Sequence, residues 1–431
     1  MASDYSAARQ EFVDRINAGA SLGIPFIQKR VNYGKRVLNE DARTNCVINL
    51  FVPAGGTGDV QALSGPDGVY DSALDITSAL AAGKGAASFY KIECYAQIAK
   101  EYHDHGTLEK MFLIGNLDKN VIQGRINHLC QNVEKDLVTR NWTKAGGACV
   151  AGSTEIGFVA MDKAMAMLQT IKSTGSWTGY ISPLFKSKLS TTAAQKQGGF
   201  DVPDDALRQM YARHAIGIYA GADWVNEAFM PEFTSGALNS TSTASTGVTV
   251  KTAVSRQGAN EITLTGITAS GSVPKGTPFT IEGVYDVSTG GIAMPWKKTF
   301  IVQEDATANG SGDVTVKVLP IYFNDDTKGY KNTVYVSGSE IGAGAVVKSD
   351  VDASTTYYVA LIKEDEAFNW TPFELEEVEG DKNTTTSTDD LTVQLVSGGD
   401  LKTRKNAMRF DCAYFGDIVD PRACRLVFYK K

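Results

Sequence analysis

The strongest candidate for chemistry is the run His103-Asp104-His105, in which two imidazoles flank a carboxylate. On a β-strand, residues i and i+2 point to the same side, so these two histidines could share a metal ion. No third ligand can be assigned, and the run lies directly before Gly106-Thr107, where a turn is expected. A surface turn is therefore the favoured interpretation. His128 and His214 fall in expected helices, where a packed or surface histidine is more common than a catalytic base.

Two glycine-rich stretches were compared with the P-loop motif of phosphate-binding proteins, and each lacks a residue that the motif requires. Residues 54–59 contain no lysine. Residues 80–85 contain Gly83-Lys84, but Gly85 stands where Ser or Thr would hold magnesium. No His-Glu-x-x-His motif occurs, and the acidic residues between 374 and 379 are too crowded in an expected loop to form a tuned acid-base pair. We predict no catalytic site, no metal site, no cofactor and no enzymatic activity.

The cysteines form no Cys-x-x-Cys pair and no Cys/His cluster with zinc-site spacing. We expect them to be reduced, scattered and mostly buried, as small hydrophobic side chains. They are Cys46, Cys94, Cys130, Cys149, Cys412 and Cys424.

Composition excludes several classes of protein. The 431 residues are enough for two or three domains, and 43% of them are hydrophobic. A formal net charge of −7 argues against a dedicated nucleic-acid binder. No run approaches the ~20 apolar residues of a membrane span, and residues 1–5 do not resemble the start of a secretory signal. We expect a protein that is soluble in the cytoplasm when it is made.

Hydrophobic periodicity predicts the elements of the first half. A short amphipathic helix is expected over 5–18, and the strongest helix signal covers 107–142. Strands are expected over 46–52 and 87–99, around a glycine-rich hairpin tip. Later elements are helices over 155–171 and 204–218 and a strand over 177–182.

The character of the chain changes near residue 234. Residues 234–246 are almost all small and polar, which is typical of a linker. Strands at roughly ten-residue spacing then predict a small all-β barrel or sandwich. These strands are expected over 248–254, 261–267, 278–284, 298–303 and 313–319, and later ones over 357–363, 391–396, 408–415 and 424–429. The acidic segment 364–381 is expected to be a solvated loop.

This order of elements resembles the major capsid proteins of tailed bacteriophages, which share the Johnson fold. It is most similar to coat proteins of short-tailed Salmonella-type phages, whose subunit carries an inserted β-barrel. Besides the long helix and its preceding hairpin, the resemblance rests on residues 217–236, on Gly276–Val284, and on Phe410–Gly416 leading to Asp420–Ala423. It covers residues 100–431 and includes no invariant motif.

The resemblance implies an α+β fold with six segments. They are an N-terminal arm (1–45), an extended hairpin loop with its flanking strands (46–100), a peripheral domain with a spine helix (101–150), the first part of an axial domain (151–236), an inserted β-barrel domain (237–347), and return strands of the axial and peripheral domains (348–431). In the family the inserted domain can carry a long hairpin that reaches a neighbouring capsomer. Here the link at 255–260 is too short, so such a contact would need the loop at 285–297 or the loop at 324–332.

The function implied is self-assembly into an icosahedral shell that encloses a double-stranded DNA genome. The implied partners are other copies in hexamers and pentamers, a scaffolding protein and a portal during assembly, and packaged DNA held non-specifically. A decoration or cement protein is a further candidate, and no membrane is involved. The expected location is the virion, after assembly in the host cytoplasm.

We further predict an interior contact made by the first helix and the basic residues after it. The residues are Phe12, Ile16, Lys29, Arg30, Lys35 and Arg36. They would meet a scaffolding protein and later lie near DNA, although the basic residues could instead pair with acidic loops of neighbouring subunits. A self-assembling surface-layer or adhesin-type β protein is the alternative function, but it should have a secretion signal and little long helix.

Overall fold

The computed structural model describes seventeen stretches of the chain. They are residues 6–18, 24–28, 47–53, 89–106, 117–152, 157–171, 175–195, 217–245, 247–255, 257–288, 292–325, 330–331, 333–336, 340–375, 382–387, 391–400 and 405–431. The chain divides into two compact units. Unit 1 combines Met1–Leu50, Glu93–Asn141 and Asp365–Val419, and unit 2 combines Phe51–Ile92, Trp142–Glu364 and Asp420–Lys431.

Unit 1 is built on a five-stranded antiparallel sheet. Its longest strand, β23 (Lys405–Ile418), pairs with β3 (Gln97–Gly106), with β20 (Phe368–Phe373) and with β22 (Thr392–Asp400), and β21 (Lys382–Ser387) pairs with β22. Residues 405–412 of β23 have partners on both sides, in β3 and β22. The strand is therefore interior to the sheet, which suits its apolar composition.

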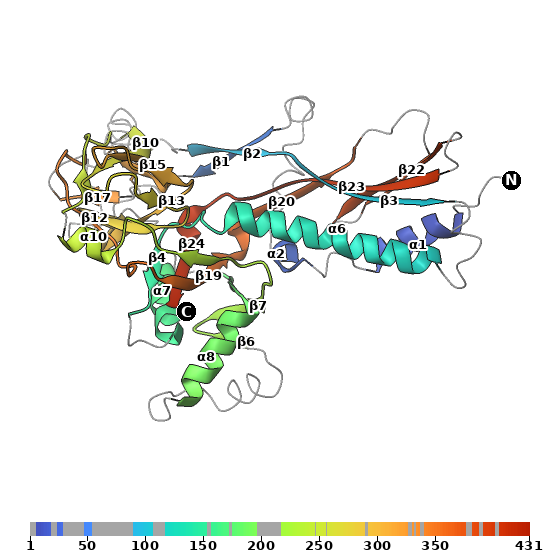
Figure 1. The fold of residues 1–431 in the computed structure, drawn as a ribbon, viewed down its shortest axis with the longest axis horizontal. Helices are drawn as coiled ribbons and strands as arrows, with labels where there is room; N and C mark the ends of the chain where they lie inside the picture. Colours follow the sequence, from blue (N-terminus) through green and yellow to red (C-terminus); the bar gives the residue numbers. More distant parts are fainter. Residues whose placement is uncertain are drawn as a thin grey trace, which may run out of the picture. The chain divides into compact units, whose positions relative to one another are not determined.

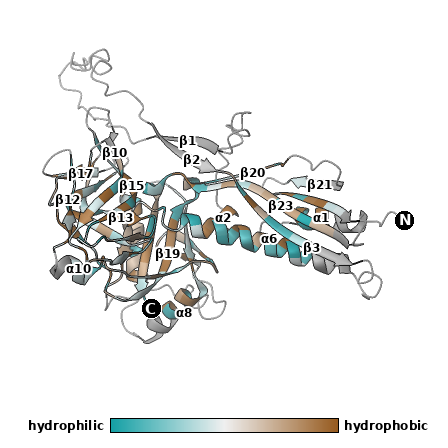
Figure 2. Cartoon of the chain, turned by 45° about the horizontal axis from the view of Figure 1, so that its top comes forward, coloured by the Kyte–Doolittle hydropathy of each residue, from teal (hydrophilic) through white to brown (hydrophobic). Residues whose placement is uncertain are grey.

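The long helix α6 (Leu117–Asn141) lies along this sheet, over β3 and β23 (Figure 1). Its apolar stripe is buried at Ile122, Ile126, Leu129, Val133 and Leu137, as the periodicity predicted. Hydrophilic and hydrophobic residues alternate along the helix, because only one face packs on the sheet (Figure 2). Residues 107–116, which the sequence also assigned to this helix, lie outside the described residues.

The C-terminal end of α6 is held by buried hydrogen bonds. Ile418 N donates to Asn141 Oδ1 over 3.0 Å, and Asn141 Nδ2 donates to Leu137 O over 2.9 Å. One turn earlier, Tyr414 donates to Asp136 Oδ2 over 2.7 Å. These bonds tie the helix to β23, which lies more than 270 residues further along the chain.

The N-terminal helix α1 (Ser6–Asn17) packs on α6, β21 and β22 and confirms the predicted short helix. The rings of Phe12 and Phe410 are 6.0 Å apart. The short helix α2 (Pro25–Gln28) places Phe26 edge-on against Phe368, at 5.1 Å. The arm thus contributes to the core of unit 1.

Unit 2 contains a central seven-stranded sheet. Its order is β4 (Ala148–Val150), β24 (Cys424–Lys430), β19 (Thr356–Glu364), β5 (Trp177–Ile181), β7 (Ala222–Asn226) and β6 (Gly217–Tyr219), with β8 (Glu232–Thr234) also pairing β19. Helix α7 (Gly157–Ile171) packs on β24 and β4, and α8 (Pro183–Gln195) contacts β19. None of the described helices is long and apolar enough to cross a bilayer.

Residues 249–348 form a second, antiparallel sheet in unit 2, here called the β region. Its long strands are β10 (Gln257–Thr265), β12 (Pro278–Val287), β13 (Ala293–Val302) and β15 (Val314–Asp325). The short strands of the same sheet are β9 (Thr249–Val250), β16 (Tyr330–Lys331), β17 (Thr333–Tyr335) and β18 (Val347–Lys348). Two small two-stranded sheets are β11 (Ser272–Val273) with β14 (Ala306–Thr307), and β1 (Val47–Pro53) with β2 (Phe89–Tyr95).

Several sequence predictions were wrong. Within the expected linker 234–246, residues Ser240–Ser245 form a helix, α10, because Asn239 Oδ1 accepts from the backbone N–H groups of Thr241 and Ser242. The expected acidic loop begins with a 3₁₀ turn and strand β20, in which Trp370 is fully buried. Gly217 and Ile218 belong to β6 instead of a helix over 204–218, and the other residues of that expected helix, 204–216, lie outside the described ranges. The expected loop 285–297 is mostly strand, in β12 and β13.

Replacing Asn141 by alanine should lower the free energy of unfolding by about 1–3 kcal/mol, since the buried amide of Ile418 would lose its acceptor. Urea denaturation followed by helical circular dichroism measures the loss, and amide exchange at Ile418 localises it. Gln131→Ala, at an exposed position of the same helix, is the matched control. Equal stability of the two variants would contradict the prediction.

Candidate functional site

The run His103–His105 lies in strand β3. His103 stands opposite Met408 of β23, and His105 stands opposite Asn406. The surface-turn interpretation was wrong, because the sustained backbone pairing with β23 outweighs the local turn preference of Gly106. Among the described residues, no group of three His, Cys, Asp or Glu side chains could hold a metal ion. His214 lies outside the described residues.

Glu101, on β3, binds two basic side chains of α6. Arg125 Nη1 donates to its Oε1, and His128 Nδ1 lies 2.8 Å from its Oε2. Burial raises the pKa of Glu101, but the bonds from His128 and Arg125 outweigh it and leave the pKa below its usual value. The His128 side chain is 56% exposed. This group ties the helix to the sheet, and His128 is a surface histidine, in line with the sequence interpretation.

Four cysteines are buried thiols that form no disulfide, as predicted: Cys130, Cys149, Cys412 and Cys424. Burial raises the pKa of Cys130 and of Cys149 to about 11. Because the thiolate is the nucleophilic form, such thiols are poorly reactive at neutral pH. Cys46 lies outside the described residues.

Phe12 and Ile16, predicted to meet a partner, are instead buried inside unit 1, with 0% and 2% exposure. Phe12 packs against Phe410 of β23, so an interface role for these two side chains would require α1 to leave the sheet. In this structure, Phe12 and Ile16 therefore pack within the chain. Lys29, Arg30, Lys35 and Arg36 lie outside the described residues.

The best candidate for an assembly surface in unit 1 is strand β3. Ile98 and Tyr102 are 47% and 61% exposed. Their side chains point away from α6, because strand residues alternate and Glu101 faces the helix. One edge of β3 pairs with β23, and the other has no partner among the described strands. An open strand edge with exposed apolar side chains is suited to pairing with another chain.

The second candidate is the place where the β region meets the segment that follows α6. Thr143 Oγ1 donates to Gln303 Oε1 over 3.0 Å, and Gln303 Nε2 donates back to Thr143 O over 2.9 Å. Gly276, with φ of +92°, lies so close to the Trp142 ring that a Cβ there would overlap it. Only glycine satisfies both the backbone angle and this approach.

A buried ion cluster lies at this junction. Asp286 on β12 accepts from Lys298 Nζ of β13 over 2.6 Å and from Arg425 Nη2 of β24 over 2.7 Å. Trp296 Nε1 also donates to Asp286, over 3.4 Å, and Val287 N donates over 3.1 Å. The three charged side chains are at most 4% exposed. One carboxylate therefore serves two cations out of contact with solvent.

Burial and charge act in opposite directions on this cluster. Burial alone would raise the pKa of Asp286, but Lys298 and Arg425 outweigh it and leave the pKa below its usual value. Burial lowers the pKa of Lys298, and the attraction of Asp286 only partly offsets this. The carboxylate is thus ionised at neutral pH. Removing one partner from a buried ion pair costs about 3–5 kcal/mol, since the other charge is left uncompensated.

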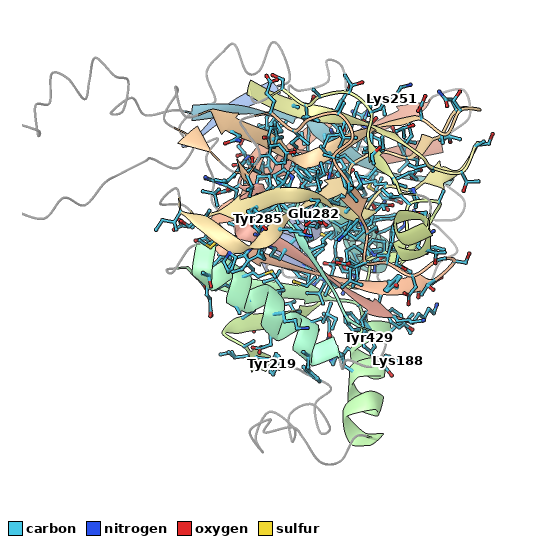
Figure 3. All side chains as sticks on the ribbon, turned by 90° about the vertical axis from the view of Figure 1, so that its left-hand side faces the viewer. Lys188, Tyr219, Lys251, Glu282, Tyr285 and Tyr429 are labelled. Carbon is cyan, nitrogen blue, oxygen red and sulfur yellow. The ribbon has the colours of Figure 1, made fainter. Side chains whose placement is uncertain are left out.

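A surface ion group on the same strand provides the contrast. Glu282, labelled beside Tyr285 in Figure 3, accepts from Lys297 at 2.6 Å and from Lys348 at 3.2 Å. All three side chains are at least 30% exposed. Exposed pairs contribute only about 0.2–1 kcal/mol each. All three side chains also belong to the β region, so this group does not join it to the central sheet.

Sequence reasoning missed the cluster, although a signal was present. Lys298 has the same strand parity as buried Met294, Phe300 and Val302, and a lysine at an inward-facing position needs a buried partner. Arg425 likewise interrupts the apolar run of β24. Neither residue's sequence position shows which side chain it pairs with, because Arg425 and Asp286 are 139 residues apart in the sequence.

Gly276→Ala should destabilise the protein by about 1–3 kcal/mol, the cost of holding a non-glycine residue at positive φ, with the overlap on Trp142 in addition. The measurement is thermal unfolding followed by tryptophan fluorescence. Gly310→Ala is the matched control, because a Cβ there meets nothing within 4 Å. A Gly276→Ala variant that unfolds like the control would contradict this role for Gly276.

No protein-family model matches the chain, and no curated protein matches it. The solved structures that match the chain include phage capsids. The capsid of Ralstonia phage GP4 is 8% identical, covers 90% of this chain and 84% of its own, and has a TM-score of 0.44. The mature capsid of bacteriophage PhiM1 is 9% identical, with 88% and 80% covered and a TM-score of 0.38. A virus-like particle from Pyrococcus furiosus is 9% identical, with 98% of each chain covered and a TM-score of 0.39.

Proposed function

We propose that this chain is a major capsid protein of a tailed bacteriophage, which assembles into an icosahedral shell around a double-stranded DNA genome. The observation that carries the proposal is the order of elements along the chain. The long helix α6 precedes a central sheet, a separate β region interrupts that sheet between β8 and β19, and β20–β24 return to complete both units. The same order underlies the resemblance found in the sequence.

Strand β3 supports a role in self-association. The edge of β3 that has no partner among the described strands and the exposed Ile98 and Tyr102 provide a surface for a second copy. A shell repeats each contact many times, so a weak individual contact is sufficient. The rigid parts of such a subunit would be α6 and the two sheets.

The β region is proposed to be the inserted barrel domain of this family. Its sheet lies between residues that pair closely in the central sheet, since Thr234 on β8 stands opposite Thr356 on β19. A contact with a neighbouring capsomer would then come from the β12–β13 turn, where Ile292 is 68% exposed, or from the segment 324–332. A scaffolding protein, a portal, packaged DNA and a decoration protein are the further partners in this proposal.

Electron microscopy of the purified chain, expressed alone and with a candidate scaffold, tests the proposal. Closed shells, tubes or regular hexamers are expected, because a coat subunit contains its own lattice contacts. A Tyr102→Glu/Ile98→Glu variant should reduce particle yield, since it places charges on the open edge of β3. Leu184→Glu, also at an exposed apolar position, is the matched control. A monodisperse monomer under all assembly conditions would refute the function.

The interior contact of the arm has its own test. Replacing Lys29, Arg30, Lys35 and Arg36 by glutamate should lower the scaffold content of particles, because four positive charges become negative where an acidic partner or DNA would bind. Scaffold and coat bands of purified procapsids give the ratio. Unchanged procapsid yield and scaffold content would contradict the interior contact, and the proposed shell function would still stand.

A further inference from the structure

The β region has a hydrophobic core of its own. Its core cluster includes Ile262, Phe279, Phe300 and Val316, and its members outside the β region, Leu238 and Val248, come from the residues just before it. No residue of the central sheet belongs to that cluster. Burial of its apolar side chains therefore does not require the central sheet, and the described contacts that join the two are a separate set.

The buried ion cluster belongs to this separate set and is asymmetric. Asp286 and Lys298 lie on neighbouring strands of the β region, so this ion pair forms between two residues of the β region itself. Arg425 is the member that comes from the central sheet. One oxygen of Asp286 faces Lys298 and the other faces Arg425, so the carboxylate is shared between the two parts.

The central sheet holds the Arg425 guanidinium in place for this contact. Arg425 Nη1 donates to Cys424 O over 3.1 Å and to Arg422 O over 3.4 Å. Gly146 and Gly147 leave room for the side chain, since a Cβ on either would lie 2.8–3.0 Å from it. The neighbouring Arg422 is paired with Asp420 and does not compete for Asp286.

We propose that Asp286, Lys298 and Arg425 form a docking latch, which places the β region on the central sheet only when the last strand, β24, is in position. With Asp286 ionised, the pair Asp286–Lys298 offers its second oxygen to Arg425. Without that carboxylate, Lys298 would have to lose its proton or lie beside Arg425 as a second buried cation, and either change opposes docking. The latch makes the placement of the β region conditional on synthesis and folding of the C-terminal strand, and it does not depend on the shell function.

Hydrogen–deuterium exchange of the full-length chain tests the latch. Asp286→Asn should raise exchange by about a hundredfold or more in residues 142–147 and 421–425, the fold-change expected when buried charges lose their counter-ion. Strands β10 and β15 should keep their protection, because they belong to the core of the β region itself. Arg425→Met should raise exchange in the same junction residues less, since Asp286 and Lys298 still neutralise each other.

The decisive comparison is between the exchange rate of the double variant Asp286→Asn/Arg425→Met and that of Asp286→Asn alone. The double variant should exchange more slowly at the junction than Asp286→Asn alone, because removal of Arg425 relieves the repulsion between the cations. A double variant that exchanges as fast as Asp286→Asn, or faster, would overturn the latch. Loss of protection in β10 and β15 together with the junction in Arg425→Met would overturn it too, by placing the cluster in one cooperative fold with the β region.

Discussion

Both units are completed by the same stretch of chain, residues 405–431. Strand β23 supplies the interior strand of the sheet in unit 1, where β3, β20 and β22 all pair with it. Strand β24 lies between β19 and β4 in the sheet of unit 2. Neither sheet can form fully until this last stretch is present, and two of its partners, β3 and β4, lie far away in sequence. Such non-local pairing is slow to form, because loop-closure entropy must be overcome first.

The β region is the exception, because the strands of its sheet pair only with one another, all within residues 249–348. Its core is local to residues 238–347. It contacts the segment after α6 at Trp142 and Thr143, and the central sheet at Arg425. A large apolar core and a small polar junction have different consequences. The core determines whether the β region folds, whereas the junction determines where it lies, since one carboxylate between two buried cations allows little freedom of placement.

Most elements could be predicted from residue pattern. The stripe of α6, the short helix α1 and the late strands β19, β22, β23 and β24 follow from apolar periodicity, and the structure places each near its predicted bounds. The predictions failed where tertiary pairing outweighed local preference. His103 and His105 are held in a strand by β23, and the acidic segment contains Trp370, whose burial draws β20 into the sheet. Phe12 and Ile16 lie on the expected helix, but the sequence did not show that they pack inside unit 1, Phe12 against Phe410.

The sequence by itself determined most of the helical and extended stretches, that the chain is rich in separate strands, and that Cys130, Cys149, Cys412 and Cys424 are buried small side chains. These properties follow from periodicity and composition, which act over a few residues. Only the tertiary structure decided that Asp286 faces inward, because irregularities in the register of β12 with β13, between Thr280 and Val287, shift the strand parity. It also brought Arg425 to that carboxylate across 139 residues. A buried charge shows in sequence that a partner is needed, but the partner is chosen by packing between distant segments.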